Sequence, residues 1–302
     1  MIHPINPCGE SPMHTAATKT HWPFEVRPLS PALGVEIIGV DFAKRIEAPL
    51  FASLYEAFNQ HKVLLFRGQE VALGRQVELA SLFGEVQIHV MNQYHAGGYP
   101  ELYRLSNLDE NGNPSGKHPD KGTMAWHTDG SWQRRTGLAT ILFAEILPNK
   151  GGNTRWADMI GAYDALDVTW KAHLAPLRAI HNLYFSRNRR HGEDPMTEEQ
   201  KRKVPPVDHP VIRTHPDTGL KCVYLGDHAE SIVGMDYDAG RALIEEVNAM
   251  TIQPNVVYEH KWQPRDLMIW DNRSTLHQAM PYDEAREKRV VRRCTVIGDV
   301  PR

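Results

Sequence analysis

Short apolar segments separated by clusters of turn residues make up most of the chain beyond Gly84. Their length and their content of aliphatic and aromatic residues are typical of strands, and they lie at 102–105, 139–145, 211–214, 222–225, 266–270 and 289–297. Stretches with helical spacing interrupt them at 163–170, 197–203 and 237–250. Many short strands with turns between them are typical of a sandwich, a barrel or a jelly roll. We therefore expect a mainly β fold with helical insertions.

The N-terminal third predicts a different mixture of elements. Residues 1–22 are polar and contain proline, so we expect a flexible N-terminal arm ahead of a single domain at 23–302. The patterns predict a strand–turn–strand unit at 24–42, helices at 48–60 and 76–83, and a buried strand at 62–67. Two irregular stretches, 89–122 and 182–206, are longer than ordinary connections, which is typical of binding loops and lids.

Composition excludes several classes of protein. The net charge of −3 provides no overall basic field, so we expect no nucleic-acid partner, and we interpret the basic runs 187–190 and 201–203 as solvated loop charges. No apolar run approaches the length of a membrane span, and the first twenty residues lack the apolar core of a signal peptide. The three cysteines show no Cys-x-x-Cys spacing, which favours a reducing compartment. We expect a cytoplasmic homo-oligomer.

A possible metal site begins at His127 and Asp129, in Ala-Trp-His-Thr-Asp-Gly. Residues i and i+2 of a strand share one face, so both side chains could chelate one metal. His277 would complete the 2-His-1-carboxylate set that is typical of non-haem Fe(II) oxygenases. The spacing of His127 and Asp129 fits a hydrogen-bonded structural pair equally well. The same pattern recurs at 118–120 and 215–217 with proline in the middle, and we interpret both as loops.

The C-terminal segment 289–297 provides a second constellation. Strand alternation places Arg289 and Arg293 on one face, with Arg292 on the other. Two cations on an otherwise apolar strand need anions to offset their desolvation, and guanidinium groups suit carboxylates. The alternative is a surface strand with solvated arginines. We interpret Arg292 as a surface residue.

Several motifs in order carry a family resemblance from about residue 24 to residue 301. They are Val63-Leu-Leu-Phe-Arg-Gly-Gln, Phe83-Gly-Glu, Trp126-His-Thr-Asp, Gly151-Gly-Asn-Thr, His209-Pro-Val-Ile-Arg-Thr-His-Pro, Trp270-Asp-Asn-Arg and Arg293-Cys-Thr-Val. The chain resembles the taurine dioxygenase / dichlorophenoxyacetate dioxygenase family of Fe(II)- and 2-oxoglutarate-dependent oxygenases. The resemblance implies a double-stranded β-helix (jelly roll) and implies that Fe(II), 2-oxoglutarate as co-substrate and O₂ are used, with His127, Asp129 and His277 as the iron ligands.

The resemblance also implies roles for residues around the metal. Arg289 and the hydroxyl of Thr154 would hold the distal carboxylate of 2-oxoglutarate, and Arg293 would contact the anionic group of the substrate or share the co-substrate. His89 and Asn92 would contact the substrate, and Gly130 would leave room for it beside the iron. The implied substrate is a small organic anion such as an aryloxyalkanoate or related carboxylic acid, whose hydroxylation could lead to its cleavage. A sulfonate or an alkyl sulfate stays open.

Two alternatives come from other classes of protein. A zinc hydrolase could use the same three ligands with a metal-bound water. A non-catalytic jelly-roll binding module could keep a vestigial site. Loss of activity without O₂ would separate an oxygenase from the hydrolase, and consumption of 2-oxoglutarate would separate it from the binding module.

Overall fold

A large sheet forms the centre of the molecule in the computed structural model, which describes residues 22–189 and 196–302. Its strand order is β1-β2-β3-β14-β6-β16-β5-β4, and only β2 and β3 pair in parallel among these described strands. The strands are β1 (Glu25–Pro28), β2 (Val35–Ile38), β3 (Val63–Phe66), β4 (His95–Ala96), β5 (Tyr99–Ser106), β6 (Gly137–Ile146), β14 (Leu267–Asp271) and β16 (Val290–Ile297). The predicted arm at 1–22 lies outside the described residues except for Trp22, so it stays a prediction.

A smaller sheet of order β13-β7-β15 faces the large one. Trp156 of β7 and Trp270 of β14 are fully buried between them, with ring centroids 5.5 Å apart. Two further small sheets, β12-β8-β9 and β10-β11, extend the molecule beside this layer. Their strands are β7 (Thr154–Asp158), β8 (Arg178–His181), β9 (Val207–Pro210), β10 (Ile212–Thr214), β11 (Lys221–Val223), β12 (Ala229–Ile232), β13 (Val257–His260) and β15 (Thr275–Ala279).

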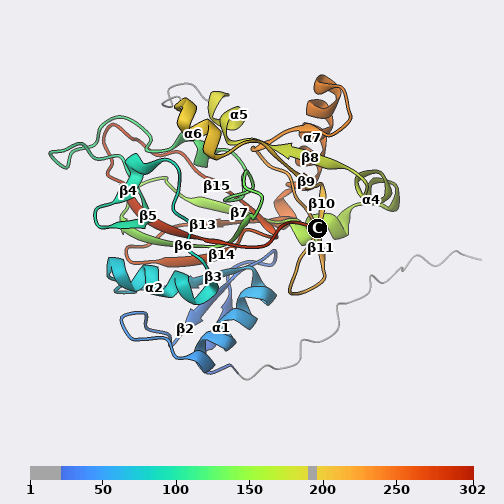
Figure 1. The fold of residues 1–302 in the computed structure, drawn as a ribbon. Coiled ribbons are helices and arrows are strands. Elements are labelled where there is room, and N and C mark those ends of the chain that lie inside the picture. The colour runs from blue at the N-terminus through green and yellow to red at the C-terminus, as the bar shows by residue number, and fades with distance from the viewer. Residues whose placement is uncertain (1–21, 190–195) are drawn as a thin grey trace, which may run out of the picture.

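Helices cover the outer face of the large sheet and the far end of the small ones (Figure 1). Leu54 and Phe58 of α1 and Leu79 of α2 pack on Phe66 and Ile141 of the large sheet. On the other side α3 and α7 share an apolar core with β11 and β12. The helices are α1 (Ala48–His61), α2 (Leu73–Phe83), α3 (Met159–Ala165), α4 (Val168–Leu174), α5 (Leu183–Asn188), α6 (Glu198–Lys203) and α7 (Tyr237–Thr251), with 3-10 turns η1 (Asn92–Tyr94), η2 (Lys121–Met124) and η3 (Pro254–Val256). No helix in the described ranges has the length and apolarity needed to cross a bilayer.

Several predicted elements differ from the structure. The helix expected at 163–170 is two helices, because Leu166 is extended and the Asp167 side chain caps α4 by accepting from the Trp170 amide. The strand expected at 211–214 is interrupted at Val211, between β9 and β10. The stretch 182–206 is not wholly irregular, because it contains α5 in addition to the predicted α6.

Arg292 is a further correction, since the structure buries it. The face of β16 that carries Arg292 is covered by α2, and its guanidinium donates to Gln76 Oε1 at 2.7 Å and pairs with Glu145 at 2.6 Å. The prediction of a surface position for Arg292 was wrong because the buried Gln76 and the partly buried Glu145 accept its hydrogen bonds. The alternation of side chains along a strand does not show such partners.

Candidate metal centre and co-substrate site

His127, Asp129 and His277 meet in one buried cluster. Each offers a ligating atom, and these atoms all lie within 4.8 Å of one another. Asp129 Oδ1 is 3.8 Å from His127 Nε2, and Asp129 Oδ2 is 3.8 Å from His277 Nε2. Two imidazole nitrogens and one carboxylate at this spacing suit a single divalent metal with positions left open.

The backbone explains why residues so far apart in the sequence meet. His127 and His277 form an isolated antiparallel bridge, with N–H···O distances of 3.0 and 2.7 Å in the two directions. His277 lies in β15, whereas Asp129 lies in the turn that follows the bridge. The expectation of a regular strand through His127 and Asp129 was therefore wrong, although both side chains still reach the same cluster.

The protonation of the three groups suits metal binding. His127 Nδ1 lies 2.8 Å from the carbonyl of Ala125, which accepts its hydrogen, so the lone pair of the ring is on Nε2, the nitrogen that faces Asp129. Burial, and then the neighbouring His127, hold the pKa of His277 well below its ordinary value, so the ring is neutral. Burial alone would raise the pKa of Asp129, but Arg293 and the neighbouring groups lower it, so the carboxylate is ionised.

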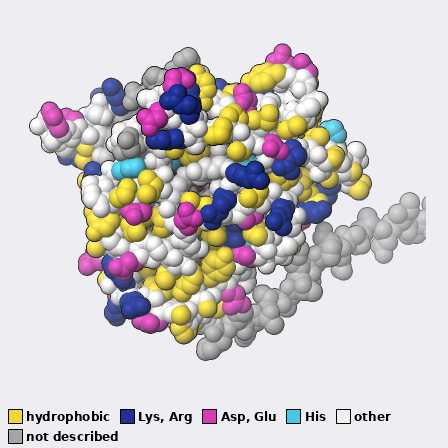
Figure 2. Space-filling model, viewed as in Figure 1, with side chains coloured by type: hydrophobic (Ala, Val, Ile, Leu, Met, Phe, Trp, Pro, Cys, Tyr) yellow, Lys and Arg dark blue, Asp and Glu magenta, His cyan; other side chains and the backbone are white. Residues whose placement is uncertain are grey.

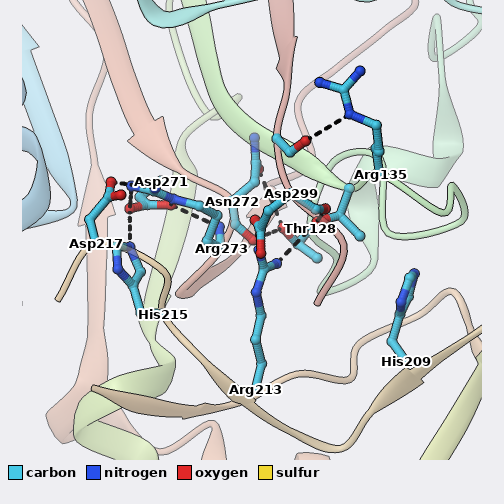
Figure 3. Close-up of polar contacts among 12 residues, drawn as sticks. Thr128, Arg135, His209, Arg213, His215, Asp217, Asp271, Asn272, Arg273 and Asp299 are labelled. Atoms are coloured by element: carbon cyan, nitrogen blue, oxygen red, sulfur yellow. Dashed lines mark hydrogen bonds and ion pairs between the residues drawn. The ribbon is translucent and has the colours of Figure 1, made fainter. Parts of the chain in front are cut away.

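Asn272 and Thr140 position the Asp129 carboxylate. The Thr140 hydroxyl donates to Asp129 Oδ2 at 2.7 Å and accepts from Asn272 Nδ2 at 2.9 Å. Asn272 Oδ1 accepts from the Asp129 amide and from the indole of Trp270, and its carbonyl accepts from Thr128, which Figure 3 shows beside it. Sequence reasoning assigned neither residue a role. The available signal was a polar residue inside or directly after an apolar strand.

The loop at 215–217 belongs to a structural network. His215 Nε2 contacts Asp271 Oδ2 at 2.9 Å, and Arg273 binds both oxygens of Asp271 at 2.8 Å (Figure 3). Arg273 also binds Asp217 at 2.7 Å. This network fixes the turn between β14 and β15, and thereby the strand that carries His277.

Arg289 is a buried cation without a hydrogen-bonding or ion-pairing partner among the described residues. Only 4% of it is exposed, and burial lowers its pKa. Burial and then Arg289 lower the pKa of the adjacent His118 to about 4, and the hydroxyl of Tyr282 has no hydrogen-bond partner in the described part of the chain. A buried guanidinium without an anion is costly, so its surroundings are suited to a carboxylate.

Thr154 is the first residue of β7, and its side chain is buried. Its hydroxyl oxygen accepts a hydrogen bond from Trp262 Nε1 at 3.0 Å. Its own hydroxyl hydrogen is therefore free for a further acceptor. Gly152, two residues before it, lies against Arg289: a Cβ there would stand 3.5 Å from Arg289 Cδ. The donors present fit the distal carboxylate of a dicarboxylic acid.

A small cavity borders the cluster on another side. His127 and Asp129 form part of its wall, together with the apolar side chains of Trp132 and Leu183. Arg293 also lines it, and its guanidinium lies 2.6 Å from Asp129 Oδ1 and over the ring of Tyr103. The cavity therefore combines an apolar wall with a cation next to the ligand cluster.

His89 lies in the wall of this cavity, but it is not a cation. Its Nδ1 accepts from the Met91 amide at 3.1 Å, and its ring packs edge-on against Tyr103 and Trp132. Burial and then Arg293 lower its pKa to about 3, so it is a neutral imidazole in this structure. The backbone of Asn92 begins η1; its side chain lies outside the described part of the chain, and its role stays a prediction.

The structure does not support the role expected for Gly130. Its φ is +73°, and a Cβ there would lie 2.8 Å from the Gly137 amide nitrogen. The missing side chain thus permits a close backbone approach and creates no space in the cavity. The prediction was wrong because a glycine next to a ligand can serve the turn that places that ligand.

The two basic runs differ from each other. On α6, Lys201 and Lys203 pair with Glu198 and Glu199 at the surface, as expected of solvated charges. Arg187 is instead 7% exposed and lines the cavity, which corrects the interpretation of the run 187–190. On the face drawn in Figure 2, basic side chains are interspersed with acidic ones.

Comparison with known proteins places the chain among dioxygenases. The family described as "Taurine catabolism dioxygenase TauD, TfdA family" matches residues 25–295. The 2,4-dichlorophenoxyacetate dioxygenase of Cupriavidus pinatubonensis is 32% identical over 280 residues, 90% of this chain and 97% of the relative. An alkylsulfatase of Acinetobacter baylyi is 32% identical, covering 91% and 86%. The crystal structure of AAD-2 with Mn(II) and N-oxalylglycine superposes with a TM-score of 0.81 at 33% identity, covering 92% and 98%.

Proposed function

Because the chain belongs to the TauD, TfdA family, it is an Fe(II)- and 2-oxoglutarate-dependent dioxygenase, and we propose that it hydroxylates a small organic anion such as an aryloxyalkanoate. The observation that carries the substrate class is the cavity in which Arg293 lies beside Asp129 and faces an apolar wall. Hydroxylation at a carbon that bears an ether oxygen would give an unstable product, so the reaction would end in cleavage.

The fold proposed for this chemistry is a double-stranded β-helix in a single domain at 23–302. The mostly β chain with helical insertions matches the solved dioxygenase over 92% of its length. Two facing sheets that bury Trp156 and Trp270 between them support the proposal.

His127, Asp129 and His277 are the proposed iron ligands. Neutral imidazoles and an ionised carboxylate are the required protonation states. Arg289 and Thr154 are proposed to hold the distal carboxylate of 2-oxoglutarate. This carboxylate would pair with the buried guanidinium of Arg289. When bound, the iron supplies the oxidising chemistry, in which O₂ and 2-oxoglutarate yield a hydroxylated carbon, succinate and CO₂. The residues of the chain orient the substrate and exclude water.

The substrate's anionic group is proposed to bind Arg293, with its apolar body against Trp132 and Leu183. This would place a carbon close to the anion near the ligand cluster, because Arg293 contacts Asp129 directly. A sulfate ester is the second candidate, favoured by the similarity to the alkylsulfatase.

The substrate class is tested by measuring succinate formation under Fe(II), O₂ and 2-oxoglutarate. Phenoxyacetate should exceed taurine and a linear alkyl sulfate, and the neutral amide phenoxyacetamide should be poor because it lacks the charge for Arg293. Equal rates with the acid and the amide would contradict an anion-binding site. A clear preference for the alkyl sulfate would select the second candidate.

The metal ligands are tested by His127→Ala, Asp129→Ala and His277→Ala. Each should abolish succinate formation and Mn(II) binding while the circular dichroism spectrum stays that of the parent protein. A variant with parental turnover would overturn its assignment. Full hydrolytic activity without O₂ would instead point to a zinc hydrolase.

We also propose a cytoplasmic homo-oligomer. Cys222 and Cys294 are buried free thiols, which fits a reducing compartment, and apolar side chains such as Val168 and Val233 are exposed on the surface. Light scattering coupled to size-exclusion chromatography would test the assembly.

A further inference from the structure

Helix α5 brings a second buried arginine to the wall of the cavity. Leu183 and Arg187 stand four residues apart in this helix, so they share one face, and both line the cavity. The start of α5 is fixed by Asn182, whose side chain accepts from the amides of Tyr184 and Phe185 at 3.0 and 3.4 Å. The position of Arg187 therefore follows from a capped helix and not from a loosely held loop.

Two guanidinium groups and two carboxylates line the cavity among the described residues. Arg187 and Arg293 both act on Asp120, and together they lower its pKa although burial opposes them. Asp120 already accepts from the Gly122 amide at 2.9 Å and from the Tyr103 hydroxyl at 3.3 Å. Asp129 is committed to the metal cluster. When Asp129 ligates a metal, Asp120 is the other carboxylate that the described lining residues place beside the two guanidinium groups.

Arg187 and Arg293 come from separate parts of the fold. Arg293 lies on β16 of the large sheet, whereas Arg187 belongs to the helical insertion between β8 and β9. Only 7% and 8% of these residues are exposed, so each charge acts in a water-poor environment where charge-assisted hydrogen bonds are strong. Leu183 and Trp132 supply apolar surface in the same wall.

We propose that Arg187 determines substrate specificity by binding, jointly with Arg293, the carboxylate of an apolar monoacid. The two guanidinium groups bind the two oxygens of a planar carboxylate, and Leu183 and Trp132 contact the apolar body. The inference rests on the proposed function and deepens it, because it adds a substrate contact that the helical insertion supplies. Arg289 is not among the residues that line this cavity, so it is independent of this contact.

The test measures binding without turnover. Calorimetric titration of phenoxyacetate and of phenoxyacetamide is carried out on enzyme loaded with Mn(II) and N-oxalylglycine. Arg187→Gln should weaken phenoxyacetate about ten- to a hundredfold, as expected for the loss of a hydrogen bond between charged groups, and leave phenoxyacetamide unchanged. Arg187→Lys should restore part of the affinity for the acid. In turnover assays the KM for phenoxyacetate should rise while the KM for 2-oxoglutarate stays the same.

Arg189→Gln is the matched control. Arg189 follows α5 directly, but it is exposed and lies 3.8 Å from Glu245 on the other side of the helix, so its replacement should leave both affinities unchanged. Equal weakening of the acid and the amide by Arg187→Gln would indicate a merely structural role and overturn the proposal. So would an unchanged affinity for the acid, or a parent protein that binds an alkyl sulfate and not phenoxyacetate. A parent protein that binds phenoxyacetate without forming succinate from any acid would instead refute the proposed function.

Discussion

The role proposed for Arg289 in binding 2-oxoglutarate predicts a cost to the stability of the ligand-free protein. Its guanidinium is buried without an anion in the described part of the chain, and a buried unpaired charge destabilises the fold. We predict that Arg289→Met raises the melting temperature measured without 2-oxoglutarate. The same change should raise the KM for 2-oxoglutarate about ten- to a hundredfold, because a charge-assisted hydrogen bond is lost. An unchanged KM would show that the co-substrate binds elsewhere.

Thr140 positions Asp129, which is one of the proposed iron ligands. Its hydroxyl donates to Asp129 Oδ2 and receives the Asn272 amide, so Thr140→Val removes both contacts while keeping the shape of the side chain. We predict about ten- to a hundredfold weaker metal binding, as is usual when the partner of a ligand is lost. Titration with Mn(II) measures it. Thr295→Val is the control, since the Thr295 hydroxyl lies 3.4 Å from Thr140 and makes no contact with Asp129 in the described structure.

A histidine and an aspartate two residues apart do not by themselves identify a site, because the same spacing occurs in the loops at 118–120 and 215–217. The order of several motifs along the chain is what singles out His127, Asp129 and His277. Arg187 was misread because a run of arginines looks solvated, and only the tertiary packing of α5 reveals that one member points inward. Thr140 and Asn272 gain meaning only from the ligand that they hold.

Among the elements, the loop that joins the His127 bridge to β6 sets the position of Asp129. Gly130 and Gly137 approach each other so closely that a Cβ at Gly130 would lie 2.8 Å from the Gly137 nitrogen, and a Cβ at Gly137 would collide with the Asp129 carbonyl. We predict that Gly130→Ala displaces Asp129, weakens metal binding and lowers turnover of small and bulky substrates alike.

Gly219→Ala is the control for the cost of placing a side chain at a positive φ, without the clash expected at Gly130. Gly219 has φ +72° and nothing within 4 Å of its missing Cβ, so its replacement should cost only about 1–2 kcal/mol of stability and leave metal binding intact. Melting curves and Mn(II) titrations compare the two variants. A Gly130→Ala enzyme that turns over small substrates normally but rejects bulky ones would restore the original space-making interpretation.

Elements were predictable where periodicity is uninterrupted. The strands β6, β14 and β16 and the helices α1, α2 and α7 follow the apolar patterns closely. β7 and β15 were missed because Thr154 and His277 replace apolar residues within very short strands. Functional residues thus weaken the pattern at the place where the site is built.

The whole molecule depends on buried ionisable groups whose protonation changes on unfolding. Burial lowers the pKa of His118 and His209 to about 4, and that of His181 well below its ordinary value. The pKa of the carboxyl of Asp271 is held low by Arg273 and His215, although burial opposes this. Figure 3 shows two of these groups, His209 and Asp271, which make no contact with each other.

These shifts predict a stability that declines with acid over a wide range. A histidine in the unfolded chain has a pKa of about 6.5. Between about pH 6.5 and about pH 4, the unfolded state therefore binds protons that the buried imidazoles of the folded state do not bind. The contribution of the neutral histidines to the free energy of unfolding is fully present above about pH 6.5 and is lost as the pH falls from there through their folded pKa. Below about pH 4, protonation of the buried carboxylates lowers the free energy of unfolding further. Urea unfolding of the metal-free protein at pH 8, 6.5 and 5 should therefore give a free energy that is nearly constant over the first step and falls over the second. His209→Gln, which removes one such group beside His181, should reduce the fall, and a parent protein equally stable at pH 6.5 and 5 would contradict the neutral burial of these histidines.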